Sequence, residues 1–150
     1  MSGVRLARHC LPTMKAAKWG RVVFISSESA INTPGEMVHY GMSKSAQLAV
    51  SRGLAQDCAG TGVTVNAVLP GPTRSEGVGD FFAKLAADGG IPVAEMERCF
   101  FAEARPTSII KRMIEPREVA SLVAYVCSNR ASATTGAALR VEGGIVPTIS

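Results

Sequence analysis

Three side chains, Ser27, Tyr40 and Lys44, have types and spacing suited to proton transfer at a carbonyl oxygen. Tyr40 and Lys44 are four residues apart, so a helix would place them on one face. A free phenol is a weak acid at neutral pH, and a neighbouring ammonium stabilises its ionised form. Ser27 ends an apolar run and could hold a substrate oxygen against the phenol. Together these groups predict acid–base chemistry on an alcohol or carbonyl while hydride moves at carbon.

The segments around these residues alternate between helix and strand patterns. Helical spacing of apolar residues predicts helices over 2–17 and 39–59. The β-branched run 21–26 is typical of a strand buried on both faces, and a second such run covers 63–69. Pro70-Gly71-Pro72 then ends the second strand sharply. Ser27 should therefore lie at the carboxyl edge of a parallel sheet, where ligands of such sheets bind.

The rest of the chain continues the alternation. Short helical pieces are expected near 76–88 and 93–104, followed by a clear helix over 118–128 and a short strand over 137–141. Strands separated by crossover helices predict an α/β fold with a parallel sheet. About three strands can be counted, and so narrow a sheet leaves an edge unpaired. We expect a single domain over residues 1–150 from which part of the sheet is missing.

Composition and charge exclude several classes of protein. Hydrophobic residues make up 47% and charged residues 19%, as in ordinary α/β proteins. No apolar run approaches the roughly 18 residues of a membrane span, and the start lacks a signal-peptide pattern, so a cytoplasmic location and no membrane partner are expected. The net charge is +4, but the basic residues are dispersed without an aromatic platform, so no nucleic-acid partner is expected. Four scattered cysteines predict reduced thiols and no metal site.

Four motifs occur in the order seen in one large enzyme family. They are GRVVFISS at 20–27, Tyr40 with Lys44, VNAVLPGPT at 65–73 and GAALRVEGG at 136–144. Nearly from end to end, the sequence resembles the short-chain dehydrogenase/reductase family. The resemblance implies a Rossmann-like, doubly wound parallel sheet. It also implies an oxidoreductase that uses NAD or NADP to interconvert a small-molecule alcohol and a carbonyl.

The resemblance also implies roles for individual residues. Tyr40 matches the catalytic acid–base, and Lys44 matches the lysine that assists it and binds the nicotinamide ribose. Ser27 matches the catalytic serine better than Ser26, which should point to the opposite side of the strand. The cofactor-binding positions implied are Tyr40, Lys44, Pro70, Gly71, Thr73 and Ser75. Pro70 and Gly71 match the turn behind the nicotinamide ring, where a missing side chain lets the cofactor approach closely.

Part of the family pattern is absent from this sequence. The Gly-rich turn that holds the pyrophosphate would open a helix after a strand, whereas Gly60-Thr61-Gly62 lies between a helix and a strand and Gly77-Val78-Gly79 lies in the long excursion. The family's catalytic Asn, expected just before the first helix, is also missing. We therefore expect an N-terminally truncated domain in which Met1 corresponds to an internal position of a complete member.

The missing half would expose an apolar sheet edge and helix faces. The helices at 2–17 and 39–59 match the pair through which family members form a two-fold interface. The resemblance therefore implies a homodimer or homotetramer through these helices. It likewise implies that the segment from about 74 to 116 is a substrate lid.

Several residues have a structural interpretation beside a functional one. The apolar lid residues could line a pocket or pack the lid helices, and the sequence leaves both open; they are Phe81, Phe82, Met96, Phe100 and Phe101. Glu28 follows Ser27, where a charged loop residue could touch the substrate, but its carboxylate is expected in solvent. Asn66 lies inside a strand and is expected to support local hydrogen bonding rather than chemistry. The candidates for the buried side of the helix at 39–59 are Met42, Ala46, Leu48, Ala49, Leu54 and Ala55.

Two hypotheses about function follow. The motif residues favour an NAD(P)-dependent oxidoreductase with Tyr40 as the acid–base. The missing cofactor half favours a catalytically inactive family member that acts only as an oligomerisation or interaction module. Cofactor binding and turnover would separate the two.

Overall fold

The computed structural model describes residues 1–149 and places three parallel strands in one sheet. The strands β1 (Gly20–Ile25), β2 (Val63–Pro70) and β3 (Ala138–Val141) lie in the order β1-β2-β3. Gly20 pairs with Val63 at the start of the first ladder. The predicted α/β fold with about three parallel strands is therefore confirmed.

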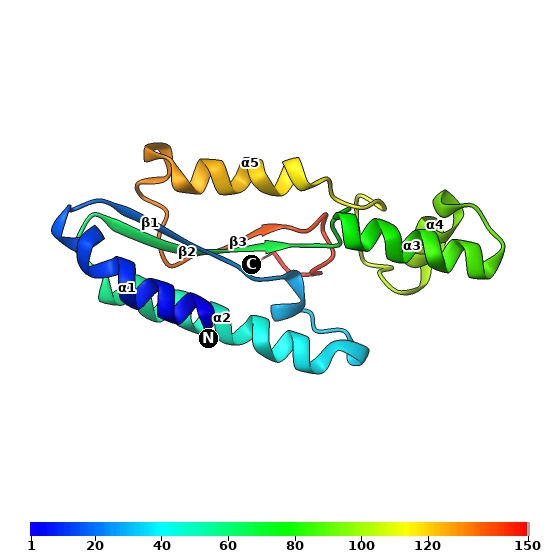
Figure 1. Cartoon of the computed structure of the whole chain (residues 1–150), viewed down its shortest axis with the longest axis horizontal. Helices are drawn as coiled ribbons and strands as arrows, with labels where there is room; N and C mark the ends of the chain where they lie inside the picture. The colour runs from blue at the N-terminus through cyan, green and yellow to red at the C-terminus, as the bar shows by residue number, and fades with distance from the viewer. Residues whose placement is uncertain (150) are drawn as a thin grey trace.

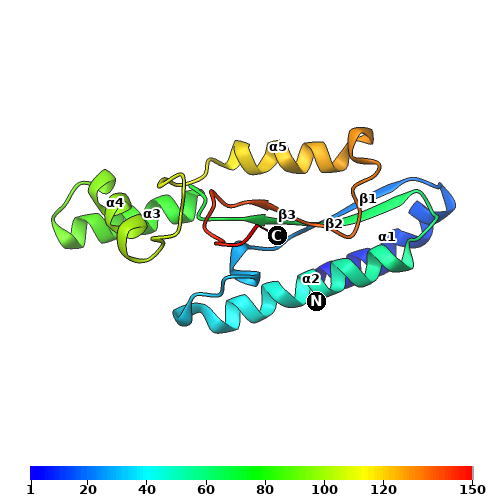
Figure 2. The same cartoon turned by 180° about the vertical axis from the view of Figure 1, so that it is seen from behind.

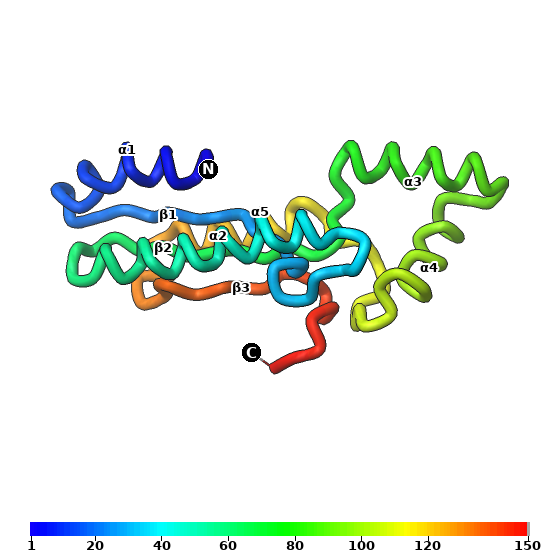
Figure 3. The backbone as a smooth tube through the Cα atoms, turned by 90° about the horizontal axis from the view of Figure 1, so that it is seen from below, coloured from blue at the N-terminus to red at the C-terminus, as the bar shows by residue number. Residues whose placement is uncertain are grey.

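Helices form a layer on each side of this sheet. Helices α1 (Ser2–Ala16) and α2 (Val38–Asp57) cover one face, and α5 (Pro116–Cys127) covers the other (Figures 1 and 2). Helices α3 (Glu76–Gly89) and α4 (Val93–Glu103) extend beyond the end of the sheet (Figure 3). Short 3₁₀ turns complete the connections at Glu28–Ala30, Gly35–Met37 and Asn129–Ala131. The carboxyl ends of the strands thus open toward α3 and α4.

Strand β2 is the centre of the core because it is covered on both faces. Its alternate residues Val63, Val65, Ala67 and Leu69 are buried in one cluster with Ala7 and Leu11 of α1. Partly buried side chains of α2, including Leu48 and Leu54, pack against the same cluster. This continuous burial is the reason that β2 reads as an unbroken apolar run.

Local sequence explains where the elements begin and end. Pro116 occupies the first turn of α5, and Glu115 and Glu118 form a reciprocal capping box there. Gly62 precedes β2 with a φ of +76°, and a Cβ at this position would collide with the backbone carbonyl of Lys18. Both the left-handed conformation and the close approach require glycine at that turn.

The predicted buried side of α2 is partly wrong. Leu48, Leu54 and Ala55 pack against the core, whereas Met42 is 69% exposed and Ala46 and Ala49 are also exposed. The fully buried positions are instead Gly41 and Ser51. Gly41 packs against Thr33 and Leu48 packs against the core, whereas Met42, about 100° around the helix from Gly41, points outward.

In the region that the structure describes, none of the helices is both long enough and apolar enough to cross a membrane.

Candidate active site

A cleft of about 510 Å³ lies where the carboxyl ends of β1 and β2 meet the start of α2 and the helices α3 and α4. Parallel strands present their carboxyl ends at one edge of a sheet, so residues that follow different strands converge there. All seven predicted site residues line this cleft: Ser27, Tyr40, Lys44, Pro70, Gly71, Thr73 and Ser75. The structure therefore brings together the positions that the sequence singled out.

Helix α2 holds Tyr40 and Lys44 in the predicted relation. The Lys44 Nζ lies 5.5 Å from the centroid of the Tyr40 ring. It donates a hydrogen bond to the Ile25 carbonyl oxygen at 3.1 Å, and the Ser26 hydroxyl donates to the Lys44 carbonyl oxygen at 2.9 Å. These two bonds fix the first turns of α2 against the end of β1. Because an ammonium has three donors, Lys44 retains two N–H groups for a ligand.

Ser27 lies in a hydrogen-bonded group with a buried acid. Its hydroxyl donates to Glu28 Oε2 at 2.5 Å, while the Ser29 hydroxyl donates to Glu28 Oε1 at 3.1 Å. Glu28 is only 5% exposed, so the expectation that it lies in solvent is wrong. The 3₁₀ turn after β1 folds the carboxylate back between the two serines. The Ser27 oxygen is thereby held in place by Glu28 and by the Ser29 N–H, which donates to it at 3.1 Å.

Gly71 is required for a reason that the sequence did not reveal. Its N–H donates to the Val141 carbonyl oxygen at 3.1 Å. A Cβ on Gly71 would lie 2.7 Å from the backbone oxygen of Glu142 and 2.9 Å from its Cα. The missing side chain therefore allows the turn after β2 to pack against the end of β3. The Thr73 hydroxyl, which donates to the Gly71 carbonyl oxygen at 2.8 Å, stiffens the same turn.

The apolar lid residues divide between the two interpretations. Phe81, Phe82 and Phe100 line the cleft, and Phe82 and Phe100 pack edge to face with centroids 5.2 Å apart. Phe101 is 2% exposed and belongs to a small core with Phe82 and Met113, against which Met96 packs. Some aromatics therefore form one wall of the cleft, and the others support that wall from behind.

Comparison with known proteins identifies the family to which the chain belongs. Residues 1–146 match the family model described as Enoyl-(Acyl carrier protein) reductase. A short chain dehydrogenase family protein from Francisella tularensis has a crystal structure that is 25% identical, with a TM-score of 0.74 over 85% of this chain and 51% of that one. The chain belongs to the short-chain dehydrogenase/reductase family. This membership confirms the resemblance and the Rossmann-type fold.

Two further members of the family are similar over almost all of this chain. An uncharacterized oxidoreductase of Bacillus subtilis, YvaG, is 48% identical over 149 residues, which are 99% of this chain and 56% of YvaG. L-sorbose reductase from Gluconobacter frateurii, solved with NADPH and L-sorbose, is 28% identical with a TM-score of 0.89 over 97% of this chain and 54% of that one. The chain therefore spans about half the length of these relatives.

The residues of this short-chain dehydrogenase/reductase chain fit one end of a nicotinamide cofactor. Lys44 has free donors, and the Pro70–Gly71 turn stands across the same cleft, as the nicotinamide ribose and ring would require. The expectation that Gly77-Val78-Gly79 does not open a helix after a strand is wrong. Gly77 and Gly79 lie in the first turn of α3, the next helix after β2. Glu76 begins that turn and opposes an anion there, so the pair is not a phosphate cradle.

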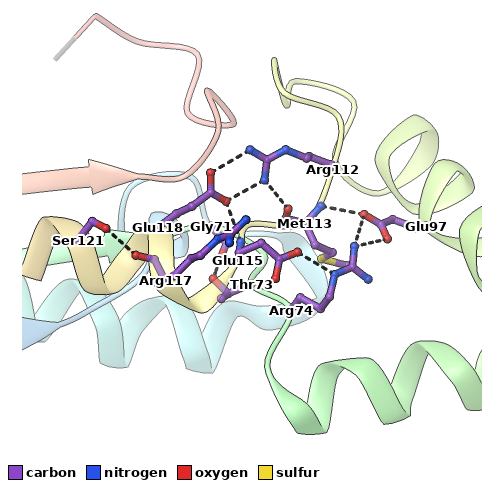
Figure 4. A network of polar contacts seen from close by, with 10 residues as sticks. All are labelled: Gly71, Thr73, Arg74, Glu97, Arg112, Met113, Glu115, Arg117, Glu118 and Ser121. Atoms are coloured by element: carbon purple, nitrogen blue, oxygen red, sulfur yellow. Dashed lines mark hydrogen bonds and ion pairs between the residues drawn. The ribbon is translucent and has the colours of Figure 1, made fainter.

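A network of ion pairs closes the base of the segment between β2 and α5 (Figure 4). Arg74 bonds Glu97 at 2.8 Å and Glu115 at 3.2 Å, and Glu97 also accepts the Met113 N–H at 2.9 Å. Backbone bonds between 72–74 and Ile114 bring the two ends of the segment together. Helices α3 and α4 are therefore anchored next to the cleft.

Glu118 connects this base to α5. Arg112 makes a bidentate pair with it at 2.8 and 2.9 Å, and the Glu115 N–H donates to it at 2.8 Å. The Arg112 hydrogen bonds, followed by the backbone bond, lower the pKa of Glu118 from 4.5 to about 2. Because this pKa is depressed in the folded state, the stabilisation is complete above about pH 4.5. It is lost as the pH falls from there toward 2.

We expect Glu118→Gln to lower the melting temperature at pH 7 by a few degrees and to have a smaller effect near pH 3. The amide loses the ion pair and one reciprocal cap at neutral pH. Near pH 3, below the unfolded pKa of 4.5 and above the folded pKa of about 2, the wild type has already lost part of that stabilisation. Thermal unfolding followed by circular dichroism between pH 2.5 and 7 measures both effects. Exposed Glu103→Gln is the matched control. An equal loss at every pH would contradict the assigned role.

Sequence reasoning did not single out Met37, Val78, Arg105 or Met113, which also line the cleft. Met37 and Arg105 stand outside the family motifs, and Met113 lies in an irregular segment. Their places depend on how α4 and the following loop fold back toward α2. For Arg105, the only signal in the sequence was its position four residues after Phe101, which ends an aromatic run.

Proposed function

We propose that this chain supplies the catalytic part of an oxidoreductase that uses NAD or NADP to interconvert an alcohol and a carbonyl. The observation that carries the proposal is the convergence of Ser27, Tyr40, Lys44 and the Pro70–Gly71 turn on one cleft. Residue types alone would not bring together positions from three separate segments. The NADPH in the L-sorbose reductase crystal structure supports the cofactor class.

In the proposed mechanism, Tyr40 donates a proton to the carbonyl oxygen during reduction and removes one from the alcohol during oxidation. Lys44 stabilises the phenolate with its charge and uses its remaining N–H groups to bind the nicotinamide ribose. Ser27 would hold the substrate oxygen beside the phenol by turning its one O–H from Glu28 to that oxygen, while the Ser29 N–H keeps the Ser27 oxygen in place. A bound nicotinamide supplies or accepts the hydride. Pro70, Gly71, Thr73 and Ser75 are proposed to contact that cofactor.

The long segment and the outer helices have proposed roles as well. The segment from about 74 to 116 would act as the substrate lid of a single partial domain over 1–150. Its wall of Phe81, Phe82 and Phe100 supports that role. Association through α1 and α2 is supported by Leu6, 65% exposed, and by the outward-facing Met42. Sedimentation velocity of the purified chain tests this association, and a strictly monomeric chain would exclude it.

Two proteins test the proposed activity. The chain alone is compared with a fusion that places it behind the first half of YvaG, whose second half it matches. We expect the chain alone to bind NADH and NADPH weakly or not at all. We expect the fusion to bind one of them and to oxidise it when a carbonyl compound is added. Fluorescence titration and absorbance at 340 nm measure binding and turnover.

A second candidate function is an oligomerisation or interaction module without catalysis. The absence of a phosphate cradle from the described residues 1–149 favours it for the chain on its own. A folded fusion that binds cofactor but reduces no carbonyl compound would reject the enzyme proposal in favour of this module.

A further inference from the structure

Arg105 lies between two cavities. It follows α4 and lines the catalytic cleft together with Tyr40 and Lys44. It also lines a second cavity of about 620 Å³, which the loop at 32–36 and the segment 103–107 enclose. Its side chain is only 13% exposed. A buried guanidinium at the junction of two cavities can contact a ligand that extends from one into the other.

The hydrogen bonds of this guanidinium are incomplete. Arg105 Nη1 donates to the Ala104 carbonyl oxygen at 2.7 Å, and its contact with Glu36 Oε1 is long, at 3.5 Å. Nη2 lies 4.0 Å from the Met37 sulfur. The buried Nε has no hydrogen-bond partner anywhere in residues 1–149. Since unpaired buried donors are costly, the group is prepared for an acceptor that the chain itself does not provide.

Neighbouring arginines show that this incompleteness is specific to Arg105. Arg74 and Arg112 each bond a carboxylate at 2.8 Å. The Arg105 guanidinium instead lies over the ring of Phe100, with the Arg105 Cζ 5.5 Å from the ring centroid. A cation packed on a ring and short of carboxylate partners retains attraction for an external anion.

The charged groups around the cleft leave Arg105 without a short carboxylate contact. Two cations, Lys44 and Arg105, line the cleft with one carboxylate, Glu28. Glu28 already accepts hydrogen bonds from Ser27 and Ser29, so it is not a partner of Arg105. The nearest carboxylate to Arg105 is the exposed Glu36, 3.5 Å from its Nη1, so a ligand carboxylate would have to compete only with this long ion pair.

We propose that Arg105 binds the carboxylate of the substrate, so that the enzyme acts on hydroxy acids and the corresponding oxo acids. The inference rests on the proposed oxidoreductase function and names its substrate class. The carboxylate takes no part in hydride transfer; it orients the substrate so that its hydroxyl or carbonyl reaches Tyr40 and Ser27. The rest of a longer substrate extends into the second cavity.

The test measures ligand binding to the 150-residue chain by ¹⁵N NMR, with the arginine Nε–H signals as the readout. Straight-chain hydroxy acids of four to six carbons are compared with their methyl esters and with inorganic phosphate. We expect an acid to shift the Arg105 Nε–H signal and to bind at least about tenfold more tightly than its ester, as a charged hydrogen bond would give. Equal binding of acid and ester, no binding of any acid, or a preference for phosphate would overturn the proposal.

Three variants separate this role from general effects of charge. Arg105→Gln should abolish the preference for the acid over the ester, whereas Arg98→Gln, on the exposed side of α4, should retain it. Glu36→Gln should strengthen acid binding about two- to threefold, because the exposed Glu36 no longer competes for the guanidinium. This variant keeps the proposal testable if Arg105→Gln does not fold. Unchanged acid binding in both Arg105→Gln and Glu36→Gln would refute the assignment.

Failure of this inference can be distinguished from failure of the proposed function. If the fusion with YvaG reduces neutral ketones as well as oxo acids, and Arg105→Gln changes neither rate, the oxidoreductase stands and the carboxylate site is wrong. If acids bind at Arg105 but no carbonyl compound is reduced, the proposed function and the substrate assignment built on it fail together.

Discussion

Replacing Tyr40 by Phe in the YvaG fusion is expected to lower carbonyl turnover by about 10²- to 10⁴-fold, the range typical of a general acid–base group. The substitution removes only the phenolic hydroxyl and leaves the ring against Lys44. Lys44 would still bond Ile25 and face the nicotinamide ribose. Cofactor affinity should therefore remain within about twofold of the parent, since the loss lies in the transition state.

The second tyrosine of the chain provides a matched control. Tyr125 lies on α5 and is 46% exposed, away from the residues that line the cleft. Tyr125→Phe should keep full turnover and the same NADPH affinity. Steady-state rates with a saturating carbonyl compound, together with fluorescence titration of the cofactor, measure both quantities. Activity of Tyr40→Phe within threefold of the parent would remove Tyr40 from the proposed acid–base role.

The order and type of the elements could be predicted because each depends on local patterns. The buried run of β2, the breaker at 70–72 and the spacing of Tyr40 and Lys44 are all readable along the chain. The convergence at the sheet edge then follows from parallel strand geometry, which presents successive strand ends on one side. For this reason all seven predicted site residues line the same cleft.

The structure differs from or adds to the sequence interpretation where turns and side-chain packing follow no period in the sequence. Glu28 is buried because the turn after β1 folds its carboxylate between two serine hydroxyls, and no period in the sequence encodes that fold. Gly71 is constrained by Glu142, seventy-one residues away, rather than by space for a ligand alone. Met42 is exposed, whereas its neighbour Gly41 is the residue that packs closely, against Thr33. Each outcome depends on tertiary packing that overrides local preference.

Arg105 illustrates the same point for the substrate site. Its sequence position, after an aromatic run, is compatible with a solvated surface arginine. Only the folded chain shows that the loop after α4 returns toward α2 and buries the guanidinium beside Met37 and Phe100. That loop is held in place by the small core of Phe82, Phe101 and Met113 and by the ion pairs of Arg74. Residues outside the family motifs therefore shape the part of the cleft that would distinguish substrates.

Replacing Asn66 by Ala should lower the free energy of unfolding of the chain by about 2–4 kcal/mol, a large part of the stability of a small domain. Asn66 is fully buried in β2, as its predicted role in local hydrogen bonding requires. Its Nδ2 donates to the Thr134 carbonyl oxygen at 2.8 Å, and its Oδ1 accepts the Ala137 N–H at 3.1 Å. These bonds extend the pairing of β2 into the segment before β3. Alanine would leave both backbone groups unpaired and create a small cavity.

Thr64 in the same strand is the matched control for this prediction. It is 6% exposed, and its hydroxyl makes no hydrogen bond within residues 1–149. Thr64→Val has nearly the same volume and removes a buried hydroxyl without a partner. It should therefore leave stability within about 1 kcal/mol of wild type or raise it. Urea unfolding followed by circular dichroism measures both variants. A loss below 1 kcal/mol for Asn66→Ala, or an equal loss for Thr64→Val, would show that the side-chain amide does not join β2 to β3.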